Sequence, residues 1–194
     1  FAYHAISAFD SIWILDTSGG YVTRIDATSG AIVGRIDVDA RGSRLAASND
    51  SVYVGAEPAV RIDPTTNLAS SITGGERTLG IISDGTTVWT GSRSGIIQRL
   101  DPDGTITSLD LPERPWMDLA FSNGMVCALS QQRGDSRLIA FDAATGELRH
   151  ETPIVIEGGS YPVRLVADND AVIVGADATG RQTGELFIID PAKK

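Results

Sequence analysis

Short apolar runs alternate with polar turns along the whole chain, and one pair of segments recurs five times. The first segment of each pair is a turn followed by β-branched or aromatic residues, at 10–13, 50–53, 85–89, 123–127 and 170–173. The second segment ends in a turn that begins with Asp26, Asp63, Asp101, Asp142 or Asp190. These aspartates are 37, 38, 41 and 48 residues apart, a spacing that indicates a repeat architecture.

The clearest copy, residues 43–73, predicts four short strands. The strands are expected at 45–48, 51–55, 59–62 and 68–72. Turn residues separate them, Asn49-Asp50 and Asp63–Asn67, and no helical periodicity is present. A four-stranded unit repeated about every 40 residues is typical of a β-propeller blade. A parallel β-helix has shorter rungs and a leucine-rich repeat has a shorter period, so both fit less well.

The sequence therefore predicts an all-β fold, a β-propeller of about five four-stranded antiparallel blades in a single domain over residues 1–194. The blades are expected at approximately 1–38, 43–73, 78–111, 116–156 and 161–190. The fifth copy is incomplete, because it ends at its third strand, and an open sheet edge exposes unpaired backbone groups. We therefore expect the ring to be completed by residues outside 1–194 or by another chain, as part of a larger or shared propeller.

The repeat also accounts for acidic and thiol groups that would otherwise suggest catalysis. In the turn 63–67, the aspartate can accept backbone N–H groups, proline presets φ, and asparagine tolerates the left-handed conformation. The repeat aspartates are therefore interpreted as turn formers and not as catalytic acids. Cys127 takes the place in the repeat that Trp13 and Trp89 hold, which indicates a small core residue and not a nucleophile.

The charge of the chain limits the classes of partner that can be expected. The formal net charge is −9, and the 16 lysines and arginines are scattered, with only Lys193 and Lys194 adjacent. Nucleic-acid binding and docking on anionic lipid both draw on clustered basic residues, so neither is expected. No stretch approaches the roughly 20 apolar residues of a membrane span, so membrane insertion is not expected either.

The recurring phrase, as in Asp50-Ser51-Val52-Tyr53 and Arg61-Ile62-Asp63-Pro64-Thr65-Thr66, resembles the repeats of the YVTN, NHL and streptogramin-lyase-like propeller superfamily. The resemblance covers essentially the whole chain. It implies a bacterial or archaeal protein, secreted or extracytoplasmic, in a class that ranges from binding sensors to rare enzymes. The lyase branch relies on several histidines and glutamates around Mg²⁺. This chain has two histidines, His4 and His150, at different places in the repeat, so the lyase chemistry does not carry over.

Propeller ligands tend to bind at the axial end, on loops that lead into the innermost strands. The residue just before the first strand of each copy is His4, Arg44, Leu79, Asp118 or Arg164. With their neighbours, the expected ligand-binding set at this axial mouth is His4, Arg44, Arg77, Trp116, Asp118 and Arg164. Arginines that face one axis would bind an anionic ligand through bidentate hydrogen bonds. The alternative is a solvated channel lined by ordinary charges.

No nucleophile, base and metal set converges in the sequence. The prediction is therefore a non-catalytic ligand- or protein-binding β-propeller, an extracytoplasmic bacterial sensor or scaffold without cofactor or metal. Its expected partner is a protein or a small anionic ligand at the axial face. The alternative is a streptogramin-lyase-like or hydrolase enzyme that uses His4, Asp118 and an arginine in the axial cavity. Self-association, which would complete the ring, is a third hypothesis.

Overall fold

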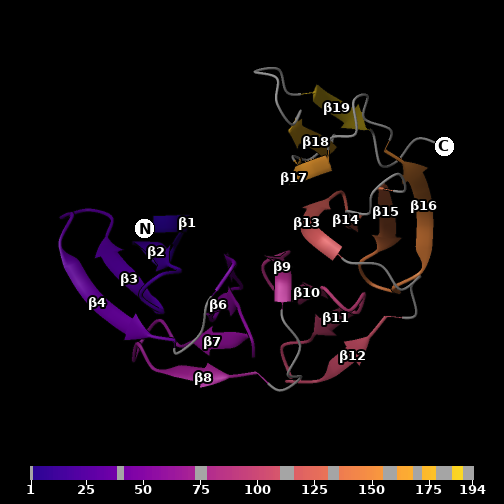
Figure 1. Ribbon diagram of the computed structural model, residues 1–194. Helices are drawn as coiled ribbons and strands as arrows, with labels where there is room; N and C mark the ends of the chain where they lie inside the picture. The colour runs from indigo at the N-terminus through magenta and orange to yellow at the C-terminus, as the bar shows by residue number, and fades with distance from the viewer. Residues whose placement is uncertain are drawn as a thin grey trace. The chain divides into compact units, whose positions relative to one another are not determined.

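The computed structural model describes residues 2–38, 42–72, 78–109, 116–130, 136–154, 161–167, 172–177 and 185–189. Every regular element in these ranges is a β-strand (Figure 1). The first two sheets contain β1 (Ala2–Ala8), β2 (Ser11–Asp16), β3 (Tyr21–Asp26), β4 (Ile32–Asp37), β5 (Arg44–Ala47), β6 (Val52–Gly55), β7 (Val60–Ile62) and β8 (Ala69–Ser71).

The remaining sheets follow the same plan. The third contains β9 (Thr78–Ser83), β10 (Val88–Ser92), β11 (Ile97–Leu100) and β12 (Ile106–Ser108). The fourth contains β13 (Trp116–Ser122), β14 (Met125–Ser130), β15 (Arg137–Asp142) and β16 (Leu148–Pro153). The fifth contains β17 (Tyr161–Ala167), β18 (Val172–Asp177) and β19 (Glu185–Ile189).

Each sheet is an antiparallel meander in which neighbours along the chain pair with each other. Four sheets have four strands, and the fifth has three among the described residues. The predicted all-β architecture of propeller blades with an incomplete last blade is confirmed.

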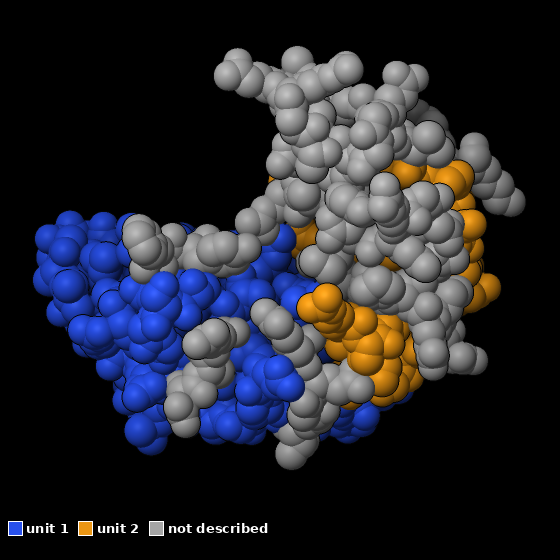
Figure 2. Space-filling model, in the orientation of Figure 1, with its two compact units in different colours: residues 1–90, 99–107 blue, residues 91–98, 108–194 orange. Residues whose placement is uncertain are grey.

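The chain divides into two compact units, coloured separately in Figure 2. Unit 1 comprises residues 1–90 and 99–107, and unit 2 comprises 91–98 and 108–194. The division passes through the third sheet, since the hairpin end at 91–98 belongs to unit 2. The single-domain interpretation of the repeat stays a prediction.

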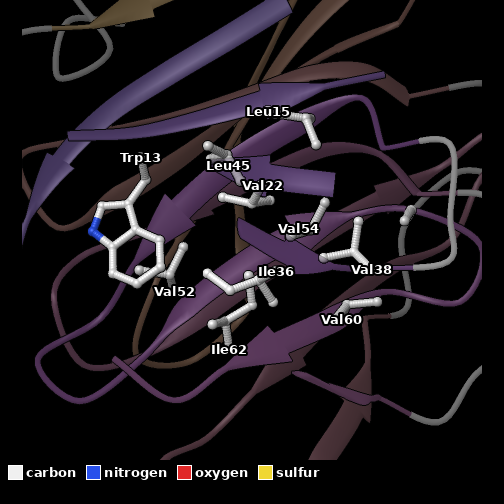
Figure 3. Close-up of a cluster of buried hydrophobic side chains, with 11 residues drawn as sticks. Trp13, Leu15, Val22, Ile36, Val38, Leu45, Val52, Val54, Val60 and Ile62 are labelled. Carbon is white, nitrogen blue, oxygen red and sulfur yellow. The ribbon is translucent and has the colours of Figure 1, made fainter. Parts of the chain in front are cut away.

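The cores of the units lie between successive sheets. In unit 1, Trp13, Leu15 and Val22 of the first sheet pack against Val52 and Val54 of the second, as Figure 3 shows. All five of these side chains have no exposed surface. Burying such a side chain contributes about 1.5–3 kcal/mol relative to leaving it in water, so this contact between sheets is a main source of stability.

A second cluster in unit 1 joins the second and third sheets, and a third cluster lies in unit 2. The second is built on Ala46, Ile81, Val88 and Leu100, with Tyr53 packed against it. The cluster of unit 2 joins the fourth and fifth sheets and consists of Ala120, Cys127, Leu129, Leu138, Ala140, Ile154, Leu165, Val172 and Val174.

The second strands differ in how completely they are covered by neighbouring sheets. Strand β10 is buried at every position. In β2, by contrast, Trp13 is fully buried while its neighbour Ile12 is 40% exposed. Successive side chains of a strand point to opposite faces, and the second sheet covers only the face that carries Trp13.

The repeat turns have the predicted geometry. The Oδ1 atom of Asp26 accepts the N–H groups of Thr28 and Ser29 at 3.1 and 2.7 Å, and Asp63 and Asp142 make the same pair of bonds in their own turns. Their interpretation as turn formers is confirmed. Asp101 differs, because its carboxylate pairs with the side chain of Arg99. Asp190 lies outside the described residues.

The stability of the fold should depend on pH, because carboxylates in its turns accept hydrogen bonds that favour their ionised form. The Gly19 N–H, with the Tyr21 hydroxyl and the Ser18 N–H, lowers the pKa of Asp16 from 3.8 to about 2. Backbone N–H groups of their turns also lower the pKa values of Asp26 and Asp142. A depressed pKa in the folded state adds stability above the unfolded pKa, and this stability is lost as the pH falls through the folded pKa.

We therefore expect the melting temperature, followed by circular dichroism, to fall steadily between pH 3.8 and about pH 2. The variant Asp16→Asn should show a shallower fall, because an amide keeps the acceptor oxygen but does not titrate. An identical pH profile for the variant would show that this carboxylate contributes nothing to acid unfolding.

Candidate functional site

The structure places the predicted axial residues inside the innermost strands and not before them. His4 lies in β1, Arg44 begins β5, Asp118 lies in β13 and Arg164 lies in β17. The strand register shifts just before His4, Asp118 and Arg164, so these three hold one equivalent position. Trp116 begins β13; its side chain and that of Arg164 are not among the described ones, and Arg77 lies outside the described residues.

His4 and Asp118 are different residue types, but each accepts a backbone N–H group of the next sheet. The Nδ1 atom of His4 accepts the backbone N–H of Leu45 at 3.1 Å. The Oδ2 atom of Asp118 accepts the N–H of Leu165 at 2.8 Å, while its Oδ1 accepts the N–H of Leu119 at 3.0 Å. Each side chain therefore links the innermost strand of one sheet to the innermost strand of the next sheet within its unit.

This link was missed by the sequence analysis. An imidazole and a carboxylate look unrelated, and only their shared ability to accept an N–H explains why both occupy the position. Four members of the predicted set are divided between the units, with His4 and Arg44 in unit 1 and Asp118 and Arg164 in unit 2. Their role in ligand binding stays a prediction.

The link from Asp118 can be tested by its effect on stability. Asp118 is 1% exposed, so Asp118→Ala would leave buried N–H groups without an acceptor and should lower the free energy of unfolding by about 1–3 kcal/mol. Asp118→Asn keeps an acceptor and should recover part of the loss. Urea denaturation measures both, and an unchanged midpoint for Asp118→Ala would remove the structural role.

Cys127 and the metal-ligating residue types give no reactive centre in the part of the chain that the structure describes. Cys127 is fully buried, and burial raises the pKa of its thiol to about 12, so the thiol stays protonated at neutral pH. Among the described residues, no group of three His, Cys, Asp or Glu side chains comes together in a way that could hold a metal ion.

Unit 1 contains a groove between the outer parts of the second and third sheets. Its cavity volume is about 340 Å³, within the range of sites that accept small ligands or side chains. The lining residues are Asp50, Tyr53, Arg61, Ser70, Ser71, Ile72, Leu100, Asp101, Pro102, Asp103, Gly104 and Ile106. The apolar members belong to the cluster between these sheets, whereas Ser70, Ser71 and the residues 102–104 are exposed.

The charges in this groove are held in defined positions. The Arg61 side chain donates from Nε to the Ser51 hydroxyl at 2.6 Å and from Nη2 to Asp50 Oδ2 at 3.0 Å. The Ser48 hydroxyl and then the Arg61 guanidinium lower the pKa of Asp50. Asp101 lies 2.8 Å from Arg99 Nη2.

Asp103 is an exposed carboxylate of the lining that makes no ion pair among the described residues, whereas the exposed carboxylate of Asp50 pairs with Arg61. Asp103 accepts the Thr105 N–H at 2.9 Å, and this bond lowers the pKa of Asp103. Three carboxylates and one guanidinium line the groove. Asp50 pairs with Arg61 and Asp101 pairs with Arg99, so the carboxylate of Asp103 is left in excess. In the sequence, residues 101–104 indicate only a turn, because the groove depends on which sheet packs beside it.

Comparisons with known proteins place the fold. No family model matches the sequence, and no curated protein matches it. Among solved structures, hydrazine synthase of Kuenenia stuttgartiensis is similar with a TM-score of 0.73, 16% identity and 97% of this chain covered. A nidogen–laminin complex gives a TM-score of 0.70 at 13% identity over 96% of the chain. Hsv2 of Kluyveromyces lactis gives 0.70 at 16% identity over 94%.

These neighbours are β-propellers, and at such low identity the likeness shows the fold alone. The chain spans 66% of the matched hydrazine synthase chain, 79% of the matched chain in the nidogen–laminin complex and 60% of Hsv2.

Within the described residues, no helix is long and apolar enough to span a membrane.

Proposed function

We propose that this chain is a non-catalytic binding module, a single β-propeller domain that recognises a segment of another protein in an extracytoplasmic compartment of a bacterium. The resemblance to YVTN- and NHL-type repeats supports the compartment and the source. The nidogen–laminin neighbour is a propeller in a complex with another protein, which supports the class of partner. A small anionic ligand at the predicted axial mouth remains part of the same proposal.

The groove of unit 1 is the observation that carries the proposal. It combines buried apolar surface at Leu100, the half-buried ring of Tyr53, and exposed polar groups of Ser70 and the 102–104 turn. Apolar surface with a few oriented polar groups is the usual composition of a recognition site.

The enzymatic alternative draws on His4 and Asp118, and both are engaged in the scaffold. The acceptor nitrogen of His4 and both oxygens of Asp118 receive backbone N–H groups. A general base needs a free acceptor within reach of its substrate. The contacts that the structure describes therefore favour binding over lyase or hydrolase chemistry.

A display screen tests the proposal. A random peptide library selected against the full chain should yield peptides whose affinity depends on the groove. Tyr53→Ala removes the aromatic wall and should raise the Kd by about tenfold, the usual cost of losing one buried aromatic contact. Isothermal titration calorimetry measures the change.

Tyr21→Ala is the matched control, because it removes the same side chain from β3, outside the groove lining. Its Kd should equal that of the unaltered protein. Ser70→Trp, which adds bulk at an exposed lining position, should also block binding without disturbing the buried cluster. Selection that yields no peptide sensitive to Tyr53 or Ser70 would refute the groove as the binding site.

A further inference from the structure

The contact between the first and second sheets shows what fills the space that is open in the groove. A row of paired residues, Ile6, Trp13, Arg24 and Gly34, crosses the first sheet. The Arg24 guanidinium stacks over the Trp13 ring at 4.8 Å from the ring centroid. Its Nε donates to Ser11 at 2.9 Å, and its Nη1 donates to the carbonyl of Pro64 and to Asn67 Oδ1.

This guanidinium closes the first contact tightly. Pro64, in the turn of the second sheet, is buried. A Cβ atom added to Gly34 would lie 3.3 Å from Asn67 Nδ2, so little space remains between the outer strand and the turn. An aromatic face, a carbonyl oxygen and a side-chain oxygen thus form a complete guanidinium site.

The second contact, between the second and third sheets, has the same arrangement of strands, with smaller side chains. The equivalent row is Ala46, Tyr53, Arg61 and Ser70, so a tyrosine replaces Trp13. The facing turn of the third sheet is one residue shorter, since Gly104 N bonds Asp101 O whereas Asn67 N bonds Asp63 O. Gly104 and Asn67 both have positive φ, 88° and 58°. A Cβ atom on Gly104 would meet nothing within 4 Å.

Arg61 does not bond the described residues of the facing turn, whereas Arg24 does so in the first contact. Its Nε bonds Ser51, as that of Arg24 bonds Ser11, but its Nη2 turns back to Asp50 on its own sheet. Among the described residues it donates to no acceptor of the third sheet. Pro102, the equivalent of buried Pro64, is exposed, and the Arg61 side chain is 49% exposed.

Resting on the proposed function, we propose that the groove between the second and third sheets binds an arginine side chain presented by a partner protein. Tyr53 supplies the aromatic face, the Pro102 carbonyl corresponds to the acceptor that Arg24 uses, and Asp103 supplies a carboxylate. The guanidinium of the partner makes the contact with the facing turn that Arg24 makes in the first contact and that Arg61, among the described residues, does not make.

The charges of the groove favour a cation over an anion. Its only guanidinium among the lining residues, Arg61, is paired with Asp50, whereas Asp103 has no basic side chain among its described partners. Asp101 is paired with Arg99, so Asp103 is the carboxylate that would repel an incoming anion and that could accept bidentate bonds from an incoming guanidinium. The formal net charge of −9 also favours the approach of a basic segment.

The proposal is tested by NMR titration of the full chain with acetyl-Gly-Arg-Gly-amide. Saturable shifts of backbone amides are expected at Tyr53, Arg61 and residues 103–105. The citrulline peptide, which keeps the shape and loses the charge, should bind about tenfold more weakly, as expected for a charged hydrogen bond. Equal affinity for the citrulline peptide, or stronger binding of the glutamate peptide, would overturn the proposal.

Two matched variants distinguish specific binding in the groove from nonspecific attraction of the peptide to an acidic protein. Asp103→Asn and Asp84→Asn remove one exposed turn carboxylate each from the third sheet, and both aspartates accept backbone N–H groups. Asp103→Asn should weaken binding of the arginine peptide several-fold and Asp84→Asn should not. Equal effects would show nonspecific charge attraction and overturn the proposal.

The double variant Tyr53→Trp with Gly104→Asn rebuilds the first contact at the second. Binding of the arginine peptide should fall at least about tenfold. A side chain at φ 88° is strained, so a cooperative thermal transition well above the assay temperature is the control that excludes unfolding as the cause. Retained binding would overturn the proposal.

The display screen distinguishes this inference from the proposed function. If the screen yields groove-dependent peptides without arginine, this inference fails and the binding function stands. If it yields no peptide that depends on the groove, the binding function fails.

Discussion

The packing of each four-stranded sheet against the next is the constraint on which this structure depends. A single sheet of this size cannot bury its own apolar face, so Trp13 and Leu15 are stable only because Val52 and Val54 cover them. Polar groups brought between the sheets must then be satisfied. His4 and Asp118 accept backbone N–H groups of the neighbouring strand, and Arg24 bonds the facing turn.

The candidate site follows from the same constraint. Where the packing is complete, as around Arg24, the space between the sheets is filled. Between the second and third sheets, Tyr53 in place of the tryptophan and a shorter facing turn that carries Gly104 together leave the groove open.

The sequence predicted the fold well because the repeat carries redundant signals. The turn at Asp63 and the core position of Cys127 were both predicted from alignment of the copies, and hydrogen bonds and burial confirm them. The groove was not predicted. Tyr53 and Gly104 are distant in sequence, and each is acceptable for its own strand or turn; only the pairing of one sheet with the next shows that together they leave a cavity. The inter-sheet link was also hidden, since His4 and Asp118 share an acceptor and not a residue type.

A pair of double-mutant cycles, measured by urea denaturation, tests most directly whether the first contact is closed and the second is open. One cycle joins Arg24 and Asn67, and the other joins Arg61 and Asp103, with each residue replaced by alanine. We expect a coupling energy of about 1 kcal/mol between Arg24 and Asn67, and a coupling indistinguishable from zero between Arg61 and Asp103. Equal couplings in the two cycles would mean that Arg61 already bridges the groove and that the second contact is closed like the first.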